Sequence, residues 1–577
     1  MKRDVARVAD STYDVIVVGG GIFGICTAWD AALRGLSVAL IEQGDFGHAT
    51  SASHFKVVHG GIRYLQHADF PRIRESSLER TALLKVAPHL VFPMPFVIPT
   101  YGHGLKGKEL MQAALAVYDL CTVDRNRPIH DPSRQIPRSQ ILNRSQVLEL
   151  FPYLATEGLS GAALFHDGQM VNPPRLSLAF VHSLIRAGGD AINYAEVIQL
   201  LQEGNRITGV AVHDRLSGDE FEVQAKMVIN ATGPWTKWLL QERGELSLKR
   251  KPIFSRDAYF ILNRDIVETH ALAIQGGTRD PDALLSRGNR HLFLVPWRGY
   301  TLVGVWHQVF EGRPESFTLT KAEIQAFIDE VNMGNLNLKI SIDDVSMWNA
   351  GLTLFGENEP GATHLSYGKR SLLIDHQKEH NIDGLISLVG VRFTTARGMA
   401  EKTIDLVLDK LGIKKKPSTT HDTSLVGGDF DSFDTILGEV EAEVQRIAPQ
   451  AVEQAVADMT GRSKVVKSLA HHHGTAFKNV LALAQSEPHL ANCIGDSSVL
   501  AAEVVYAIRN EMACRLADVV FRRTDLGTGA YPGQASIRSC AELMATELRW
   551  TPQRQEQELE DVLARFPQWL DRDKKKE

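Results

Sequence analysis

The hydrophobic positions near the N-terminus predict a strand, a helix and a second strand in close succession. Val15–Val18 is an apolar, β-branched run of the kind that forms a strand buried on both faces. Apolar residues at helical spacing follow from residue 22 to residue 33, and Gly35 stands where a helix ends in a left-handed residue. Ser37–Ile41 is the next apolar run. This pattern predicts a β–α–β unit, the building block of a parallel sheet.

Apolar runs further along the chain alternate between strand and helix patterns. Prolines at 88, 93, 95 and 99 exclude a helix there and favour an extended strand or an edge. Helices are predicted at 109–120, 171–188 and from about 395, and strands at 191–200, 207–213, 220–223, 227–232, 251–262, 291–296, 300–308 and 385–389. Beyond about residue 416 helical patterns dominate. We therefore expect an α/β chain with a boundary near 415–425 and a helical remainder.

Length, charge and cysteine usage narrow the class of protein. A chain of 577 residues is too long for one core, so two to four domains are expected. The net charge of −6 and the lack of a basic stripe argue against nucleic acid as a partner. Five scattered cysteines without a C-x-x-C predict reduced thiols in a cytoplasmic protein, with no metal site. Residues 1–12 lack a secretory apolar region and are predicted to be a disordered lead-in.

Three glycines after the first predicted strand carry a nucleotide-binding pattern. Gly19, Gly21 and Gly24 have G-x-G-x-x-G spacing, in which the glycines allow a tight turn, a close approach to a pyrophosphate and close helix packing. The helix that follows offers backbone N–H groups to the phosphates. Glu42, at the end of the second strand, is placed to bind the adenosine ribose. The pattern predicts a dinucleotide site, and the alternative is a chance glycine turn in another α/β unit.

Further stretches carry a resemblance to a known family. They are His59–Leu65 (HGGIRYL), Asn230–Trp235 (NATGPW), Gly390–Ala396 (GVRFTTA) and Ala502–Gly527 in the helical part. Together with the glycine motif, they resemble the FAD-dependent glycerol-3-phosphate dehydrogenase family, one of the flavoproteins related to D-amino-acid oxidase. The resemblance extends from residue 13 to about residue 550, and the helical stretch narrows it from the superfamily to this family.

The resemblance implies an α/β fold in which a Rossmann-like FAD-binding domain is interleaved with a β-rich substrate domain and capped by a helical C-terminal domain. The FAD-binding segments are expected at about 13–90, 165–250 and 380–415, within an oxidoreductase domain spanning 13–415. The substrate domain is expected at about 91–164 and 251–379. The helical C-terminal domain is expected at 416–577.

The resemblance also implies which residues hold the FAD. The glycine motif would take the pyrophosphate, Glu42 the ribose, and residues 390–395 would direct backbone N–H groups at the isoalloxazine, where they stabilise the charge of the reduced ring. The full set of expected FAD contacts is Gly19, Gly21, Gly24, Glu42, Thr50, Ser51, His59, Gly60, Gly61, Val197, Thr232, Gly233, Gly390, Arg392, Phe393 and Thr394.

The reaction that the resemblance implies is hydride transfer from C2 of glycerol 3-phosphate to the flavin, which gives dihydroxyacetone phosphate. Electrons then pass to a quinone, or to oxygen in an oxidase branch. Two alternatives stay open. One is a related dehydrogenase or oxidase that acts on another polyol phosphate, a hydroxy acid or an amine. The other is a flavin-binding protein without turnover.

The substrate motifs depart from the family pattern. A histidine near the substrate becomes Tyr259, and the usual Gly-Thr-Thr-Asp becomes Gly304–His307. An arginine associated with the substrate phosphate becomes Thr353, and a second arginine becomes Tyr367 in an ungapped alignment. A threonine cannot replace the bidentate hold of an arginine on a phosphate. Candidates to compensate for the lost charge are Arg256, Lys369 and Arg370.

Four residues are candidates for the chemistry. Arg392 keeps the charge of the family lysine and would clamp an anionic group or support the reduced flavin, or else form an ion pair at a helix start. His307 is a candidate general base, although a lone strand histidine is more often structural. Tyr259 would bind a substrate hydroxyl, and Arg298 would line the pocket; both residue types are also common at pocket rims. His471–His473 is expected to be a solvated helical turn rather than a set of metal ligands.

The predicted helix at 109–120 has two interpretations. Basic residues flank it, so it could lie in a membrane interface, but a helix docked on its own domain is the favoured reading. A small-molecule substrate is expected as a partner. A quinone acceptor, a peripheral contact with the inner face of the cell membrane and a homodimer are hypotheses. No apolar run reaches the length of about 18 residues that a transmembrane helix requires.

Overall fold

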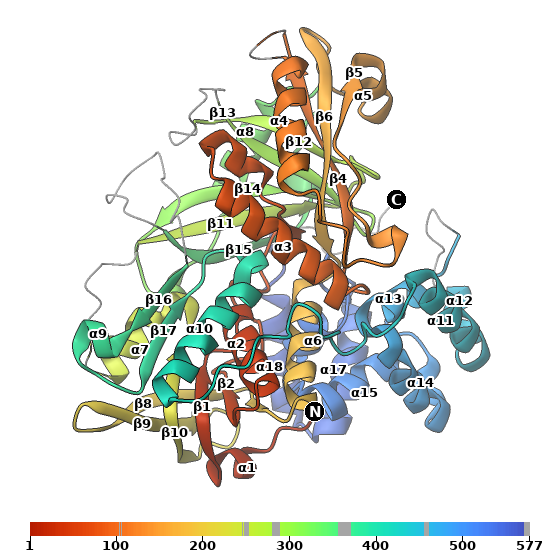
Figure 1. The fold of residues 1–577 in the computed structure, drawn as a ribbon. Helices are drawn as coiled ribbons and strands as arrows, with labels where there is room; N and C mark the ends of the chain where they lie inside the picture. The colour runs from red at the N-terminus through yellow and green to blue at the C-terminus, as the bar shows by residue number, and fades with distance from the viewer. Residues whose placement is uncertain are drawn as a thin grey trace.

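The computed structural model describes residues 1–102, 104, 107–244, 246, 253–279, 289–355, 371–454 and 461–569. Two β-sheets and a group of C-terminal helices make up the fold (Figure 1). The first sheet lies at the lower left of the figure, the second across the upper half, and the C-terminal helices at the lower right. The α/β architecture and the helical C-terminal part agree with the sequence prediction.

The first sheet grows from the predicted β–α–β unit. Its strand order is β16-β17-β10-β1-β2-β7, and the pairs around β1 are parallel. Along β1, Val15 and Val17 pack under the helices on one face, while Ile16 and Val18 pack against the β8–β10 meander on the other. The prediction of a strand buried on both faces is confirmed. The strands are β1 (Thr12–Val18), β2 (Val38–Ile41), β7 (Asp190–Ile192), β8 (Ala195–Glu203), β9 (Arg206–Asp214), β10 (Glu220–Asn230), β16 (Leu372–Asp375) and β17 (Leu385–Val389).

Three helices cover one face of this sheet. They are α2 (Ile22–Leu33), α6 (Pro173–Arg186) and α10 (Ala396–Leu411). Strand β10 is continuous, whereas the sequence pattern suggested two separate strands at 220–223 and 227–232. The reason is that β10 changes partner midway: residues 220–224 pair antiparallel with β9, and residues 224–230 pair parallel with β1.

The second sheet has the strand order β15-β11-β14-β13-β12-β4-β6-β3, and β5 pairs with β6. The proline-rich run is strand β4, so the predicted extended strand is confirmed, but it does not lie at an edge of the sheet: β6 pairs along its whole length and β12 pairs with it at Phe96 and Val97. Strands β3, β5, β6, β12 and β15 were not predicted. The strands are β3 (Val57–Val58), β4 (Val91–Tyr101), β5 (Gln140–Asn143), β6 (Leu159–Met170), β11 (Ile253–Leu262), β12 (Ala271–Arg279), β13 (Asn289–Trp297), β14 (Tyr300–Phe310) and β15 (Val345–Phe355).

Helices and short helical turns connect or cover the second sheet. Two of them, α3 and α4, pass beside β4 and β6 near the centre of the molecule (Figure 1). The elements are η1 (Ile62–His67), α3 (Phe70–Val86), α4 (Lys108–Cys121), α5 (Arg144–Leu150), η5 (Pro314–Ser316) and α8 (Lys321–Asn332). Helix α9 (His376–His380) instead lies beside β16 and β17 of the first sheet. Helices η4 (Gly233–Trp235) and α7 (Thr236–Arg243) follow β10 in the first sheet.

The C-terminal helices dock on the first sheet through buried charged groups. Asp45 accepts hydrogen bonds from Arg522 and Arg523, and Arg175 donates to Glu511 at 2.7 Å and 2.9 Å. The helices are α11 (Phe433–Ile447), α12 (Pro449–Gln454), α13 (Lys464–His473), α14 (Phe477–Ser486), α15 (Ala501–Glu511), α16 (Leu516–Asp518), a π-helix (Val519–Arg523), α17 (Gln534–Leu548) and α18 (Pro552–Leu563). No helix in the described part of the chain is both long and apolar enough to cross a membrane.

Two sequence predictions about polar segments are wrong. Residues 1–12 are ordered: helix α1 (Val5–Ala9) forms, Arg3 pairs with Asp214 at 2.7 Å, and the Met1 amino group donates to the Asn510 carbonyl. These long-range contacts, which no local pattern announces, hold the segment. His471–His473 is also not a solvated turn, since the last two histidines are buried against the rest of the protein.

Candidate functional site

One cavity of about 740 Å³ lies between the two sheets. It receives the ends of β1, β2, β10 and β17 from the first sheet and side chains of β11, β14 and β15 from the second. Most of the predicted cofactor residues line it: Gly19, Gly21, Glu42, Thr50, Ser51, His59, Gly61, Val197, Thr232, Gly233, Gly390, Arg392, Phe393 and Thr394. Gly24 and Gly60 lie behind this lining, where each allows the close approach of a neighbouring group: the Gly19 carbonyl at Gly24 and the Arg80 guanidinium at Gly60.

The glycine turn is shaped by backbone packing. Gly19 has a φ of +107°, a conformation that favours glycine, and a Cβ at Gly24 would stand 1.9 Å from the Gly19 carbonyl oxygen. Gly21 caps α2 without a side-chain hydrogen bond, and the neighbouring Ile22 N–H donates to Ser51 at 3.0 Å. The first turn of α2 therefore faces the cavity with its N–H groups, as a pyrophosphate site requires.

Glu42 closes one end of the cavity. Its carboxylate is buried and accepts hydrogen bonds from the backbone N–H groups of Gly20 at 2.6 Å and Gly44 at 2.7 Å. These two bonds fix the carboxylate beside the glycine turn, where the sequence motif places the ribose hydroxyls.

Residues 390–394 and the turn at His59–Gly61 build a further part of the same cavity lining. A Cβ at Gly390 would meet the ring of Phe23 at 2.1 Å, so the chain passes close to this ring. The His59 N–H donates to Thr394 Oγ1 at 3.3 Å, which joins the two segments. We call this part of the cavity, together with the glycine turn and Glu42, the cofactor end.

Two buried residues that sequence reasoning missed hold the His59–Gly61 turn. Asp167 accepts from the Gly60 N–H at 2.7 Å and from the guanidinium of Arg80 at 2.8 Å. Arg80 is fully buried and also donates to the His166 carbonyl. Arg80 stands in the charged sequence RESSLER at residues 74–80, and nothing in this local pattern points to Asp167 on β6.

The cofactor end fits FAD. A single cavity runs from Glu42 past the N-terminus of α2 to residues 390–394, which matches an extended dinucleotide with its ribose, pyrophosphate and ring in that order. At Gly21 an added Cβ would reach only Ser51 Oγ, at 3.4 Å, so the turn is open on its cavity side. An extended dinucleotide cradle that opens onto a second sheet defines the class of FAD-dependent oxidoreductases.

Four side chains of the second sheet face the cofactor end, and we call them the substrate wall: Asp257, Tyr259, His307 and Thr353. Asp257 and Tyr259 lie two residues apart on β11 and so share a face, and His307 lies opposite Asp257 on β14. His307 Nδ1 lies 2.7 Å from Asp257 Oδ1, and the Ser255 hydroxyl donates to the same oxygen.

Lys56 lies behind Tyr259. Its ammonium group donates to the Tyr259 hydroxyl at 2.5 Å and lies 4.6 Å and 4.4 Å from the ring centres of Tyr259 and Trp297. Burial, with a further contribution from Arg298, lowers the pKa of Lys56 to about 7. Burial raises the pKa of Tyr259 above its ordinary value, so its phenol keeps its proton.

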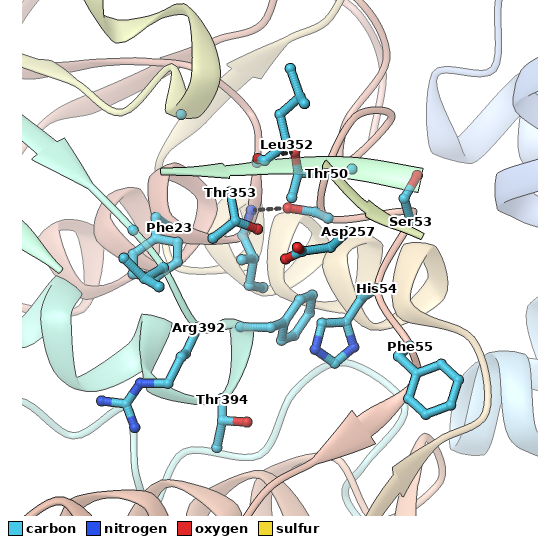
Figure 2. A pocket seen from close by; sticks show the side chains of 18 of the residues that line it. Phe23, Thr50, Ser53, His54, Phe55, Asp257, Leu352, Thr353, Arg392 and Thr394 are labelled. Carbon is cyan, nitrogen blue, oxygen red and sulfur yellow. Dashed lines mark hydrogen bonds between the residues drawn. The ribbon is translucent and has the colours of Figure 1, made fainter. Parts of the chain in front are cut away.

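His54 lies between the substrate wall and the cofactor end. Figure 2 shows its imidazole below Asp257 and across the pocket from Arg392. Burial, aided by His59 and Lys56, lowers the pKa of His54 to about 3, so this imidazole is neutral. Its Nδ1 accepts a hydrogen bond from the backbone N–H of Lys56 at 3.1 Å.

The arginines differ from the sequence expectation. Arg392 lines the cavity but also forms the ion pair that was its alternative, with Glu75 at 2.9 Å. Arg63, which was not singled out, lines the cavity too. Arg298 does not: it pairs with Asp525 at 2.6 Å, because it follows β13 toward the C-terminal part. Arg256 cannot compensate for the lost charge, because it faces the other side of the sheet and binds Glu323.

Three residues of the sequence argument, Tyr367, Lys369 and Arg370, lie outside the described residues.

Helix α4 adjoins the cavity on one side and solvent on the other. Met111 and Leu115 line the cavity, whereas Leu120 is 75% exposed and Val123, just beyond the helix, is 76% exposed. The helix itself was predicted, and it is docked on its own protein through one face only.

Comparisons with known proteins agree with this class. The model of the family described as FAD dependent oxidoreductase matches residues 14–348, and that of the C-terminal domain of alpha-glycerophosphate oxidase matches residues 418–555. A glycerol-3-phosphate dehydrogenase of Synechocystis sp. is 30% identical over 97% of both chains. One from Mycobacterium leprae is 29% identical over 97% of this chain and 89% of the relative.

A solved structure shows the same fold. The glycerol-3-phosphate dehydrogenase of Bacillus halodurans, complexed with FAD, superimposes with a TM-score of 0.72 at 22% identity, over 97% of this chain and 96% of that one. The chain belongs to the FAD-dependent glycerol-3-phosphate dehydrogenase family.

Proposed function

We propose that this protein oxidises the C2 hydroxyl of glycerol 3-phosphate, giving dihydroxyacetone phosphate. The observation that carries the proposal is the single cavity in which an FAD cradle meets a wall bearing a paired histidine and aspartate. The names of the relatives support the substrate. Bound FAD supplies the acceptor for the hydride that leaves C2.

The substrate wall supplies the proton acceptor in this proposal. His307 takes the proton of the C2 hydroxyl as the C2–H bond breaks, which is a usual role for an imidazole. Asp257 accepts from Nδ1 of His307 at 2.7 Å, so it fixes the ring orientation and stabilises the imidazolium that forms. The Tyr259 hydroxyl oxygen accepts a hydrogen bond from Lys56, so the hydroxyl proton is oriented for donation to the substrate.

Arg63 and Arg392 are the proposed partners of the phosphate. Both line the cavity near Tyr64, whose ring centre lies 5.4 Å from the Arg392 guanidinium carbon. Guanidinium groups bind phosphate through paired N–H donors, so two of them can replace the arginine lost at Thr353. Hydrogen bonds to Glu75 at 2.9 Å and to Ser76 at 3.0 Å hold Arg392 in place and use two of its five N–H groups.

We also propose that the electrons leave to a quinone at a membrane surface, through the region of α4. One face of α4 touches the cavity while the apolar side chains Val117, Leu120 and Val123 are exposed at its far end. Exposed apolar residues of this kind bind interfacial lipid. Sedimentation with vesicles, with and without Leu120→Ser, tests the membrane contact. The homodimer stays a prediction.

The experiment that tests the reaction is anaerobic reduction of the FAD-loaded protein. Glycerol 3-phosphate is expected to bleach the oxidised flavin absorption, while glycerol at the same concentration does so far more slowly because it cannot engage the arginines. Other polyol phosphates, hydroxy acids and amines are tested in the same screen. Bleaching by one of these and not by glycerol 3-phosphate would overturn the substrate; bleaching by none would make the protein a flavin-binding protein without this activity.

A further inference from the structure

Asp257 is placed at the centre of the substrate wall. On β11 it lies opposite His307 of β14 on one side and opposite Gly351 of β15 on the other. Gly351 has no side chain that could cover Asp257. A Cβ added at Gly351 would meet Thr50 at 3.1 Å. Figure 2 shows the Asp257 carboxylate in the pocket, close to Thr50 and Thr353.

The two carboxylate oxygens of Asp257 have different surroundings. Oδ1 accepts from the Ser255 hydroxyl and from His307. No hydrogen bond from any other described residue reaches Oδ2, although the side chain is 26% exposed and lines the cavity. One oxygen is thus fixed by the protein and the other is available to a ligand.

The charge of Asp257 limits what can bind there. A carboxylate only accepts hydrogen bonds, so its ligand must be a donor, and a phosphate dianion would be repelled. Of the groups around it, Thr50, Thr353 and the neutral His54 carry no positive charge, and His307 is already paired with Oδ1. The phosphate-binding arginines Arg63 and Arg392 belong to other segments of the cavity lining.

We propose that Asp257 is a specificity-determining residue that binds the hydroxyl next to the one oxidised, through Oδ2. The proposal rests on the proposed function and deepens it. His307 and Asp257 lie side by side on neighbouring strands, so His307 contacts the C2 hydroxyl of a vicinal diol and Asp257 binds the C1 hydroxyl. The substrate class is a polyol monophosphate that binds in one direction, with its hydroxyl end at the substrate wall and its phosphate toward the arginines.

The test compares two substrates that differ only in that hydroxyl. Glycerol 3-phosphate and propane-1,2-diol 1-phosphate, matched in configuration at C2, are used to reduce the FAD-loaded protein anaerobically. The wild type is expected to favour glycerol 3-phosphate in kcat/KM by roughly 10- to 100-fold, because the deoxy analogue leaves a carboxylate oxygen without its donor. In Asp257→Ala the ratio is expected to fall close to one.

The ratio separates a binding role from a structural one. Disturbing His307 through Asp257 would slow both substrates equally and leave the ratio unchanged. Asp257→Asn is the second variant, for use if Asp257→Ala fails to hold FAD. It keeps the side-chain shape and one acceptor oxygen, so it is expected to give an intermediate ratio. Asp343→Asn, an exposed aspartate outside the cavity, is the matched control and keeps the wild-type ratio.

The outcomes are distinct. A wild-type ratio near one, or a ratio that persists in Asp257→Ala and Asp257→Asn, overturns the role of Asp257 while glycerol 3-phosphate still reduces the flavin. If glycerol 3-phosphate does not reduce the wild-type flavin at all, the proposed function itself fails, and the role of Asp257 fails with it.

Discussion

The two ends of the cavity are built by different means. At the cofactor end, main-chain groups make the shape: Gly24 packs on the Gly19 carbonyl, and the Glu42 carboxylate is held by two backbone N–H groups. At the substrate wall, side chains from three strands make the surface, and Asp257 and His307 meet only because β11 and β14 pair in one register. A surface made by side chains can change its chemistry while the backbone stays the same.

Because of this difference, we expect substitutions to be tolerated more readily at the substrate wall than at the cofactor end. A side chain added at Gly24 would collide with backbone that cannot move away. A substitution at Thr353 or Tyr259 alters one side chain on a strand that keeps its pairing. The following changes test how far this division holds.

The largest effect is expected for Gly24→Ala. Its Cβ would lie 1.9 Å from the Gly19 carbonyl oxygen, so the turn and α2 must separate and the pyrophosphate site is lost. The purified variant is expected to contain little or no FAD by absorbance. Gly438→Ala is the matched control: nothing lies within 4 Å of its Cβ in helix α11, so FAD content stays normal and stability rises by about 0.5–1 kcal/mol. A yellow Gly24→Ala protein with normal FAD affinity would contradict the backbone argument.

The next effect concerns the support of the cofactor end by the C-terminal part. Burial alone would raise the pKa of Asp45, but Arg523 and Arg522 outweigh it and hold that pKa well below its usual range. Asp45→Ala would leave buried Arg523 with no carboxylate and buried Arg522 with Asp518 alone, at a cost of about 3–5 kcal/mol in the free energy of unfolding. Denaturant unfolding of the FAD-loaded protein measures this.

Asp422→Ala serves as the control for Asp45→Ala. Asp422 pairs with Lys85 at 2.5 Å, but its side chain is 57% exposed, so its removal is expected to cost no more than about 1 kcal/mol. Equal losses for the two variants would show that the buried ion pairs do not brace the cofactor end.

The contrast between a cofactor end built by local main chain and a substrate wall built by strand pairing also decides what could be predicted from the sequence. The β1–α2–β2 unit and Glu42 were predicted because all their signals lie within 30 neighbouring residues. Strands β6 and β12 escaped because glycines such as Gly161, Gly168 and Gly276 interrupt their apolar alternation. Only the pairing with neighbouring strands, which local patterns do not encode, makes these segments extended.

The substrate wall could be predicted only in part. Tyr259 and His307 were found because they stand at motif positions of the family, and both line the cavity. Asp257 was overlooked as a partner of His307, because the two are 50 residues apart and meet through strand register. Arg298 was misplaced for the same reason, since its partner Asp525 belongs to a distant part of the chain.

The third prediction addresses the chemistry of the substrate wall. His307→Gln keeps a donor for Asp257 but removes the base, so the rate of flavin reduction by glycerol 3-phosphate is expected to fall by roughly 100-fold or more. FAD content should not change, because His307 does not belong to the cofactor end. Stopped-flow absorbance measures the rate.

His213→Gln is the matched control for His307→Gln. His213 is a strand histidine of the first sheet whose side chain is 35% exposed, beside Glu220, and it does not line the cavity. Its substitution is expected to leave the rate within a factor of two or so of the wild type. If His307→Gln had a similarly small effect, His307 would not be the proton acceptor, and another residue of the substrate wall would have this role.

The smallest effect, and the one that most sharpens the comparison, is a pH dependence of stability at the substrate wall. Burial lowers the pKa of Lys56 from 10.5 to about 7. Between these two pH values the unfolded chain binds one more proton than the folded chain, so the contribution of Lys56 to stability rises with pH through this window. Below pH 7 the folded protein holds a buried ammonium group, which disfavours folding.

Lys56→Met removes this titration. The variant is expected to gain stability over the wild type at pH 6, and the difference should shrink by on the order of 1–3 kcal/mol between pH 7 and pH 9. Thermal unfolding at a series of pH values measures the difference, and Lys378→Met, whose side chain is 77% exposed, should show no such trend. A difference that does not depend on pH would mean that Lys56 stays charged in the folded protein, and that the contact with Tyr259 is a fixed ionic hydrogen bond. The substrate wall would then be held as rigidly as the cofactor end, and the contrast between the two ends would lie in their chemistry alone.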